Sequence, residues 1–303
     1  MEQGIRNIVL GVAELEPEDP QLAPTLRLAE ALGATLHVVH AYHLPDPVLY
    51  PYPEMPVFSS EHLKEVEEQT RTRLEAQVQA LSRGASIVCR AVPLPAEKAI
   101  LDVADEVHAD LVVVGATRRG TLARTILGTT AQRVVRAAKA PVLVRRREEH
   151  DQLRRILFTT DLSDHSEAVY RRGRELTAIL GRGEVAEHRV LLVLDYDVPP
   201  LPPLSRESLV DSAMPELERF LRSVDPSAPG SIATIRIGEA SKEIVAEASD
   251  WKADLLVVGT HGRKGASRFL IGSVAEGVVR TAMCDVLVIP SAALAAQPEA
   301  QTP

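Results

Sequence analysis

One pattern occurs twice in this sequence, and the repetition limits the chain to a small set of folds. A run of aliphatic residues ends at Gly115, and a closely similar run ends at Gly259, 144 positions further along. Gly128-Thr129 and Gly272-Ser273 follow at the same offset. Self-similarity over this length indicates a duplicated domain. A chain of 303 residues has room for two domains of about 150 residues, each large enough to bury its own core.

Each copy alternates short aliphatic runs with amphipathic segments. Alternation of this kind predicts right-handed βαβ units and a mostly parallel sheet covered by helices. The expected fold class is α/β, with two tandem doubly wound, mostly parallel five-stranded sheets and helices on both faces. The expected strands are 7–13, 35–42, 85–92, 111–115, 142–145, 156–160, 189–194, 232–237, 255–259 and 286–290. The expected helices are 20–32, 60–81, 95–107, 129–138, 166–180, 205–224, 241–249 and 273–282.

The duplication also sets the expected domain limits. Residues 1–146 are predicted to form the first domain, and a charged stretch at 147–154 links the copies. Residues 155–290 are predicted to form the second domain, and 291–303 a flexible tail.

Charge and cysteine content argue against several classes of protein. The formal net charge is −8, whereas nucleic acids and acidic membranes call for a basic protein face. The only cysteines, Cys89 and Cys284, occupy unlike positions in the two copies, which fits a reducing compartment. No apolar run approaches the ~18 residues of a membrane helix. We expect a soluble cytoplasmic protein that binds neither nucleic acid nor membrane.

A glycine-rich basic loop follows the strand that ends at Gly259. Gly259 and Gly262 lack a Cβ and so let a ligand approach the backbone. A helix is expected to begin at Gly272-Ser273, where unpaired backbone N–H groups can bind phosphate. The loops after the first and fourth strands of a doubly wound sheet converge, so Asp161 is expected nearby. That aspartate either binds a base or ribose, or only caps the next helix. The two loops together favour a nucleotide site.

These residues resemble the motif of the universal stress protein family in its tandem two-domain form. The family pattern is Gly-x-x-Gly, nine residues, then Gly-Ser or Gly-Thr. It stands here as Gly259-Thr260-His261-Gly262, the nine residues 263–271, and Gly272-Ser273. The resemblance covers nearly all of both copies and implies a Rossmann-like fold related to the adenine nucleotide alpha hydrolases. It also implies an ATP-binding regulator of the stress response, with or without Mg²⁺.

The resemblance assigns roles to residues of the second copy. Asp161 would contact adenine, Val193 and Val258 would line the base pocket, and Arg263 would add charge near the phosphates. The other site residues would shape the loop after the first strand or hold ribose and phosphates: Thr159, Thr160, Gly259, His261, Gly262, Gly272, Ser273 and Val274. His261 has two open interpretations, a phosphate contact and a loop-packing residue, because a neutral imidazole suits either.

The first copy departs from this motif at two places. Arg118 stands where the second copy has Gly262, and Ala13 stands where it has Asp161. A bulky side chain blocks backbone approach to phosphate, and alanine cannot accept a hydrogen bond from adenine. The first copy is therefore expected to be empty or to bind nucleotide with much lower affinity, although Gly120 could restore part of the lost backbone freedom.

Catalysis and metal binding have little support in the sequence. A nucleotide hydrolase or nucleotidyl transferase needs a positioned base, a metal-binding carboxylate or a lysine at the γ-phosphate. Only Lys264 and Asp161 lie near the predicted site, so slow ATP hydrolysis stays open as an alternative while no catalytic residue is assigned. His37, His40 and His43 are not expected to bind metal, since side chains alternate between the faces of a strand and no other ligand completes a site.

A third alternative is a nucleotide-independent scaffold. The closing strands at 142–145 and 286–290 are short and apolar, so pairing them would remove two exposed sheet edges. The resemblance implies the same contact, because single-domain members dimerise through this strand. We therefore expect an intramolecular pseudo-dimer of the two copies, a further homodimer, and a protein client that the sequence does not name.

Overall fold

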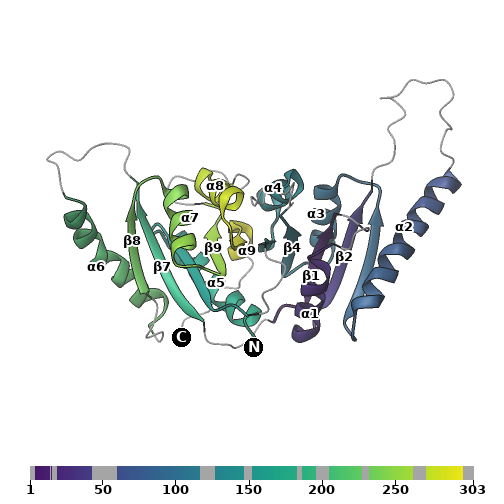
Figure 1. Cartoon of the computed structure of the whole chain (residues 1–303), viewed down its shortest axis with the longest axis horizontal. Helices are drawn as coiled ribbons and strands as arrows, with labels where there is room; N and C mark the ends of the chain where they lie inside the picture. Colours follow the sequence, from purple (N-terminus) through teal and green to yellow (C-terminus); the bar gives the residue numbers. More distant parts are fainter. Residues whose placement is uncertain are drawn as a thin grey trace, which may run out of the picture. The chain divides into compact units, whose positions relative to one another are not determined.

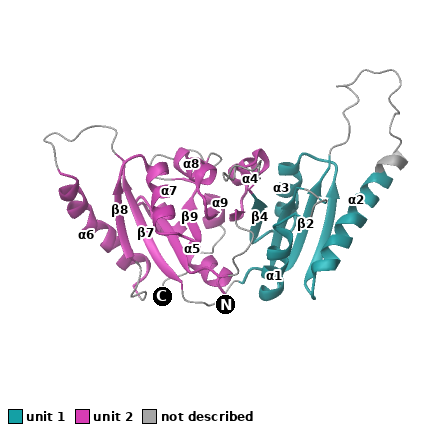
Figure 2. Ribbon diagram, viewed as in Figure 1, with its two compact units in different colours: residues 1–115 teal, residues 116–303 magenta. Residues whose placement is uncertain are grey.

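The chain falls into two compact units in the computed structural model. The described residues are 4–13, 15, 19–42, 60–116, 127–146, 152–182, 186–195, 205–226, 232–261 and 271–295. Residues 1–115 form unit 1 and residues 116–303 form unit 2 (Figure 2). The last helix and strand of the first sequence copy therefore belong to the same compact unit as the second copy.

Unit 1 is a parallel sheet with helices between successive strands (Figure 1). The strand order is β3-β2-β1-β4, and β1 pairs with both β2 and β4. The elements are β1 (Asn7–Val12), α1 (Leu22–Leu32), β2 (Thr35–Ala41), α2 (Ser60–Leu81), β3 (Ser86–Val92), α3 (Ala96–Glu106) and β4 (Leu111–Gly115).

The described residues of unit 2 form six strands in the order β5-β10-β9-β6-β7-β8. All neighbours are parallel except β5 and β10. The elements are α4 (Thr129–Ala137), β5 (Val142–Arg145), β6 (Arg155–Thr160), α5 (Asp164–Leu180), β7 (Glu187–Leu194), α6 (Arg206–Val224), β8 (Ile232–Ile237), α7 (Ala240–Asp250), β9 (Leu255–Gly259), α8 (Ser273–Thr281), β10 (Asp285–Ile289) and α9 (Ser291–Ala295). The predicted mostly parallel α/β fold is confirmed.

The two closing strands pair with each other, as their exposed apolar edges predict. β10 runs antiparallel to β5 with Leu287 opposite Leu143, and both side chains are buried. A buried carboxylate lies beside this pair, where Asp285 Oδ1 accepts the backbone N–H of Arg146 at 2.7 Å. The pairing removes two sheet edges within unit 2.

Helix α5 lies unusually close to the sheet of unit 2 because it carries a glycine at the contact. A Cβ at Gly173 would lie 2.8 Å from Val257 Cγ1 and 3.0 Å from Phe158 Cε1. Phe158 packs against Tyr170 of the same helix, with ring centroids 4.9 Å apart. This close packing anchors α5, whose first turn forms one wall of the candidate site.

The chain does not lose regular structure immediately after the last strand. Residues 291–295, expected to begin a flexible tail, form helix α9, while 296–303 lie outside the described residues. The physical reason is a set of polar contacts made by Ser291, which sequence periodicity does not report. Within the described part of the chain, no helix is long and apolar enough to cross a membrane.

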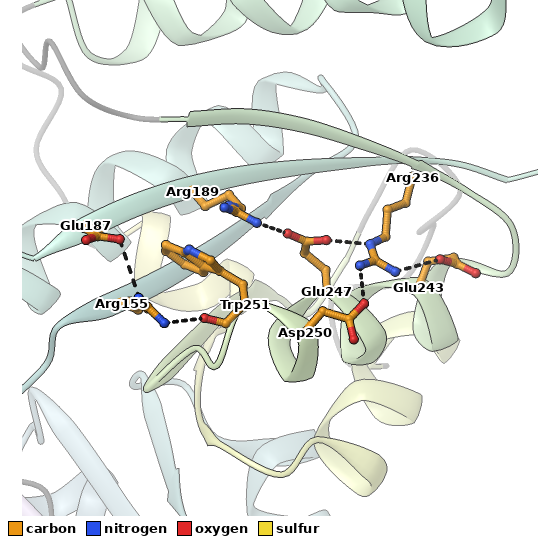
Figure 3. Close-up of polar contacts among 8 residues, drawn as sticks. All are labelled: Arg155, Glu187, Arg189, Arg236, Glu243, Glu247, Asp250 and Trp251. Carbon is orange, nitrogen blue, oxygen red and sulfur yellow. Dashed lines mark hydrogen bonds and ion pairs between the residues drawn. The ribbon is translucent and has the colours of Figure 1, made fainter. Parts of the chain in front are cut away.

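A buried carboxylate joins α7 to the neighbouring strands β7 and β8 (Figure 3). The Glu247 side chain is 4% exposed and forms ion pairs with Arg189 and, at 2.5 Å, with Arg236 Nε. Arg189 also stacks over the Trp251 ring, 4.4 Å from its centroid. Arg236 continues to Asp250 at 2.6 Å. A single glutamate thus neutralises two guanidinium groups that the fold has taken partly out of water.

We predict that Glu247→Gln lowers the free energy of unfolding by about 3 kcal/mol, because two guanidinium groups lose their shared buried charge partner. Arg236 keeps its ion pair with Asp250, so the expected loss of stability lies at the lower end of the range for a broken buried ion pair. Urea denaturation measures it. The matched control is Glu243→Gln, which removes a more exposed partner of the same arginine, 3.5 Å away, and should cost under about 1 kcal/mol. Equal losses would contradict the central role of Glu247.

Candidate functional site

The candidate site lies where the strand order of unit 2 reverses. From β6 the chain moves outward through β7 and β8, then returns to form β9 on the other side of β6. Phe158 of β6 is in register with Val257 of β9, so the carboxyl ends of these parallel strands are neighbours. The loops that begin at Asp161 and Thr260 therefore open at the same edge of the sheet, where such folds form ligand crevices.

The loop after β6 is held by its own side chains. Asp161 Oδ1 accepts the backbone N–H of Ser163 at 3.1 Å and its hydroxyl at 2.5 Å, and Leu162 between them has φ 62°. Ser163 then caps α5 by accepting the N–H of Ser166 at 3.2 Å. Asp161 thus makes the local turn that the capping interpretation describes. A carboxylate offers about four acceptor positions, and both of these bonds are made to Oδ1.

Thr260 links the end of β9 to three other segments. Its backbone N–H donates to Ile289 O at 3.2 Å, and its carbonyl accepts the N–H of Gly272 at 2.7 Å. Its hydroxyl accepts the N–H of Ser291 at 3.3 Å. A Cβ at Gly272 would lie 3.2 Å from Thr260 O, so glycine permits this approach. The glycine loop is therefore closed at its base by backbone contacts.

Helix α8 begins at this closure with its N-terminus facing the same loop. Gly272 is the N-cap residue, and among the described residues no side chain caps the helix. The N–H of Gly272 is committed to Thr260, which leaves the first-turn N–H groups of Ser273 and Val274 as the donors for an anion. Val274 is 39% exposed. In contrast, α5 carries a serine cap.

Two histidines from different elements meet beside these loops. The rings of His165, on α5, and His261, after β9, lie edge to face with centroids 6.1 Å apart. His261 Nδ1 is 2.9 Å from the hydroxyl oxygens of both Thr260 and Ser291. Burial and the nearby His261 lower the pKa of His165, while Asp161 acts in the opposite direction. Both loops are therefore in contact through polar side chains.

The remaining predicted site residues take varied positions. Thr159 donates its hydroxyl to Val257 O at 3.3 Å and links β6 to β9. Thr160 is buried, and its hydroxyl lies 2.8 Å from that of Ser166. Val258 is buried within β9, and Val193 is half-buried near the end of β7. The predicted residues Gly262 and Arg263 lie outside the described residues, as does Arg118 of the first copy.

Unit 1 builds the corresponding loop differently. At the offset of 148 that aligns Asp161 with Ala13, the first residue of α5 corresponds to position 16, six residues before α1 begins at Leu22. Proline at position 20 disfavours helical backbone at Asp19, so α1 cannot begin as early. Residues 16–18, which correspond to 164–166 in unit 2, lie outside the described residues, and α1 is described from Leu22.

Asp19 holds the turn that precedes α1 in unit 1. Its carboxylate accepts the N–H of Ala13 at 3.0 Å and that of Gln21 at 2.9 Å, and it is buried. The Gln21 side chain packs against the end of β4, with Cγ 3.0 Å from where a Cβ on Gly115 would lie. Unit 1 thus has the Gln21 amide against Gly115 where unit 2 has Val169 against Gly259.

Sequence reasoning did not identify two members of this site. His165 was not singled out because one histidine in the first turn of a helix carries no periodic signal. Ser291 was assigned to the tail. Their contribution depends on the meeting of segments that are over 100 residues apart, from His165 to Ser291.

Comparison with known proteins identifies the domain type. The model of the universal stress protein family matches twice, at residues 4–146 and 152–290. Universal stress protein Rv2005c of Mycobacterium tuberculosis is 31% identical over 193 residues, which cover 60% of this chain and 62% of that protein. Universal stress protein MJ0531 of Methanocaldococcus jannaschii is 52% identical over 52 residues, covering 17% of this chain and 31% of that protein. This chain thus aligns with less than two thirds of the length of these relatives.

Solved structures share the fold over almost the whole chain. A structure from Pseudomonas aeruginosa UCBPP-PA14, described as a universal stress protein, has a TM-score of 0.68 and 21% identity, covering 97% of this chain and 96% of that chain. A universal stress protein from Archaeoglobus fulgidus has a TM-score of 0.60 and 15% identity, covering 93% and 97%. At these identities the likeness concerns the fold.

We predict that His165 titrates below its ordinary pKa of 6.5, because burial and His261 disfavour its charged form. The imidazole is then neutral at pH 7. Asp161→Asn should lower the pKa of His165 further, since it removes the charge that raises it, and Asn still accepts the Ser163 bonds. NMR titration of the ring protons measures both values. A midpoint above 6.5, or a rise in Asp161→Asn, would contradict this arrangement.

Proposed function

This chain belongs to the universal stress protein family, and we propose that it is an ATP-binding regulator whose nucleotide site lies at the carboxyl ends of β6 and β9. Adenine would contact Asp161 beside Val193 and Val258. The phosphates would lie at the N-terminus of α8, with Arg263 adding positive charge. Mg²⁺ would enter, if at all, with the phosphates of the nucleotide.

One observation carries the proposal: an acidic turn and an uncapped helix N-terminus converge at the carboxyl edge of adjacent parallel strands. Thr260 joins the end of β9 to the start of α8, since its carbonyl accepts the N–H of Gly272. First-turn N–H groups without a side-chain cap favour an anion. A carboxylate at the neighbouring strand end suits an exocyclic amine or ribose hydroxyl. The carboxylate suits the hydrogen-bond donors at the base end of a nucleotide, and the helix N-terminus suits the negatively charged phosphates at its other end.

Unit 2 is the proposed site, and the first copy is proposed to bind nucleotide weakly or not at all. Support comes from the late start of α1 and from Ala13 in place of Asp161. The buried Asp19 carboxylate in that loop would also repel a polyphosphate.

We assign this protein a regulatory role in the cytoplasm. Bound ATP would alter the loop between Gly259 and Gly272 and thereby change the surface offered to a protein client. The role of the β5–β10 pair would be to hold the two copies as a pseudo-dimer, which a second chain could extend to a homodimer. Cys89 and Cys284, both within the described residues, are not joined by a disulfide.

We predict that Val274→Asp weakens ATP binding by roughly tenfold or more, because a carboxylate in the first turn of α8 repels phosphate. Isothermal titration calorimetry on the whole chain measures the affinity. Aspartate is favourable in a first helical turn and Val274 is partly exposed, so the variant should fold normally.

The matched control is Thr130→Asp, at the equivalent position of α4 in the first copy. It should leave ATP affinity unchanged. Equal weakening by both variants would place nucleotide in both copies, and the absence of ATP binding by the unmodified chain would end the proposal.

A separate prediction concerns the base. Asp161→Asn should weaken ATP binding roughly tenfold, because an amide nitrogen cannot accept the hydrogen bond that we assign to the carboxylate. Binding of inorganic triphosphate should change little. If both ligands lose affinity equally, Asp161 acts through the loop rather than on adenine.

A further inference from the structure

Ser291 lies just beyond the second segment matched by the family model, yet it reaches into the candidate site. It is the first residue of α9 and follows the buried Pro290 at the end of the last strand. Its backbone N–H donates to Thr260 Oγ1 at 3.3 Å, and its hydroxyl lies 2.9 Å from His261 Nδ1. One residue thus contacts two consecutive positions of the glycine loop.

The hydrogen-bond directions around His261 favour one form of its ring. The hydroxyls of Thr260 and Ser291 both lie 2.9 Å from Nδ1. An unprotonated Nδ1 has one lone pair, which the two hydroxyls can share as donors, whereas a protonated Nδ1 offers no acceptor for a hydroxyl hydrogen. Thr260 Oγ1 accepts the N–H of Ser291, and among the described residues Nδ1 of His261 is the acceptor within reach of the Thr260 hydroxyl hydrogen. The neutral ring then carries its hydrogen on Nε2.

His165 can make a further hydrogen bond to the Ser291 hydroxyl. Its Nε2 lies 3.5 Å from Ser291 Oγ. If His165 donates from Nε2, the serine oxygen accepts it and the serine hydrogen is directed to His261 Nδ1. The lowered pKa of His165 agrees with the neutral form that this sequence needs.

The orientation matters because His261 stands in the loop proposed to hold phosphate. The backbone on its N-terminal side is fixed by Thr260 N–H to Ile289 O, at 3.2 Å, and by Gly272 N–H to Thr260 O, at 2.7 Å. With the backbone fixed, the hydroxyl contacts decide how the ring is turned and which nitrogen bears hydrogen. An Nε2–H group is a donor suited to a phosphate or ribose oxygen.

We propose that Ser291 is a positioning residue of the nucleotide site, which holds His261 in the Nε2–H form as a donor to the bound nucleotide. The proposal rests on the proposed function for its ligand, ATP. It also resolves the two interpretations of His261, since the same ring packs through Nδ1 and donates through Nε2. Helix α9 thereby becomes part of the site.

The test compares the unmodified chain with Ser291→Ala and Ser291→Thr. NMR of the imidazole ¹⁵N nuclei reports the His261 tautomer without ligand, and calorimetry with ATP reports affinity. Ser291→Ala should shift the His261 ring signals toward a mixture of tautomers and weaken ATP binding about three- to tenfold, the effect of one lost hydrogen bond. Ser291→Thr restores the hydroxyl and should recover both. Ser212→Ala, which removes an exposed hydroxyl bonded to Leu209 O on α6, should change neither.

The two readouts separate this inference from the proposed function. Unchanged ring signals in Ser291→Ala overturn the positioning role, whatever the nucleotide affinity. Shifted ring signals with unchanged ATP affinity show that His261 does not donate to the ligand, and this also overturns the proposal. If the unmodified chain binds no ATP, the proposed function fails and the donor role of His261 fails with it, while the ring signals still decide whether Ser291 sets the tautomer.

Discussion

The hydrogen bonding between β6 and β9 is the constraint on which the candidate site depends. These strands are almost 100 residues apart in sequence, yet Ile156 lies in register with Leu255 and Phe158 with Val257. Parallel pairing brings their carboxyl ends to one edge, where each strand releases a loop. The convergence of these two loops follows from that register, since a shift of one residue would turn alternate side chains to the other face.

The residue at which each helix begins then determines which side chains the preceding loop can present to a ligand. In unit 2, the turn at Asp161 and the cap at Ser163 allow α5 to begin four residues after β6 ends, which brings His165 to the crevice. In unit 1, Pro20 delays α1, and Asp19 turns inward to satisfy backbone N–H groups. Duplicated strands can therefore support unequal sites, because the local chemistry of a few loop residues decides where the helix begins.

Much of the fold could be predicted from the sequence because its signals are local. The helix expected at 205–224 is observed as Arg206–Val224, since Ser205 caps it and its apolar residues repeat with helical spacing. The apolar edges of the closing strands predicted that β5 and β10 pair. The helix expected from 166 instead begins at Asp164, because its start depends on a serine that is itself held by Asp161. Helix α9 could not be predicted, since short alanine-rich segments become ordered mainly through tertiary contacts.

The sequence by itself determined the duplicated α/β architecture, the family and the loops that carry candidate ligands. These properties can be read from periodicity, spacing and glycine placement, none of which requires knowledge of the packing. Only the tertiary structure decided that Gly272 N–H is committed to Thr260, that Glu247 holds two arginines, and that Ser291 meets His165 and His261. Such contacts join residues distant in the chain, and their geometry depends on strand register and helix position together, so no local pattern encodes them.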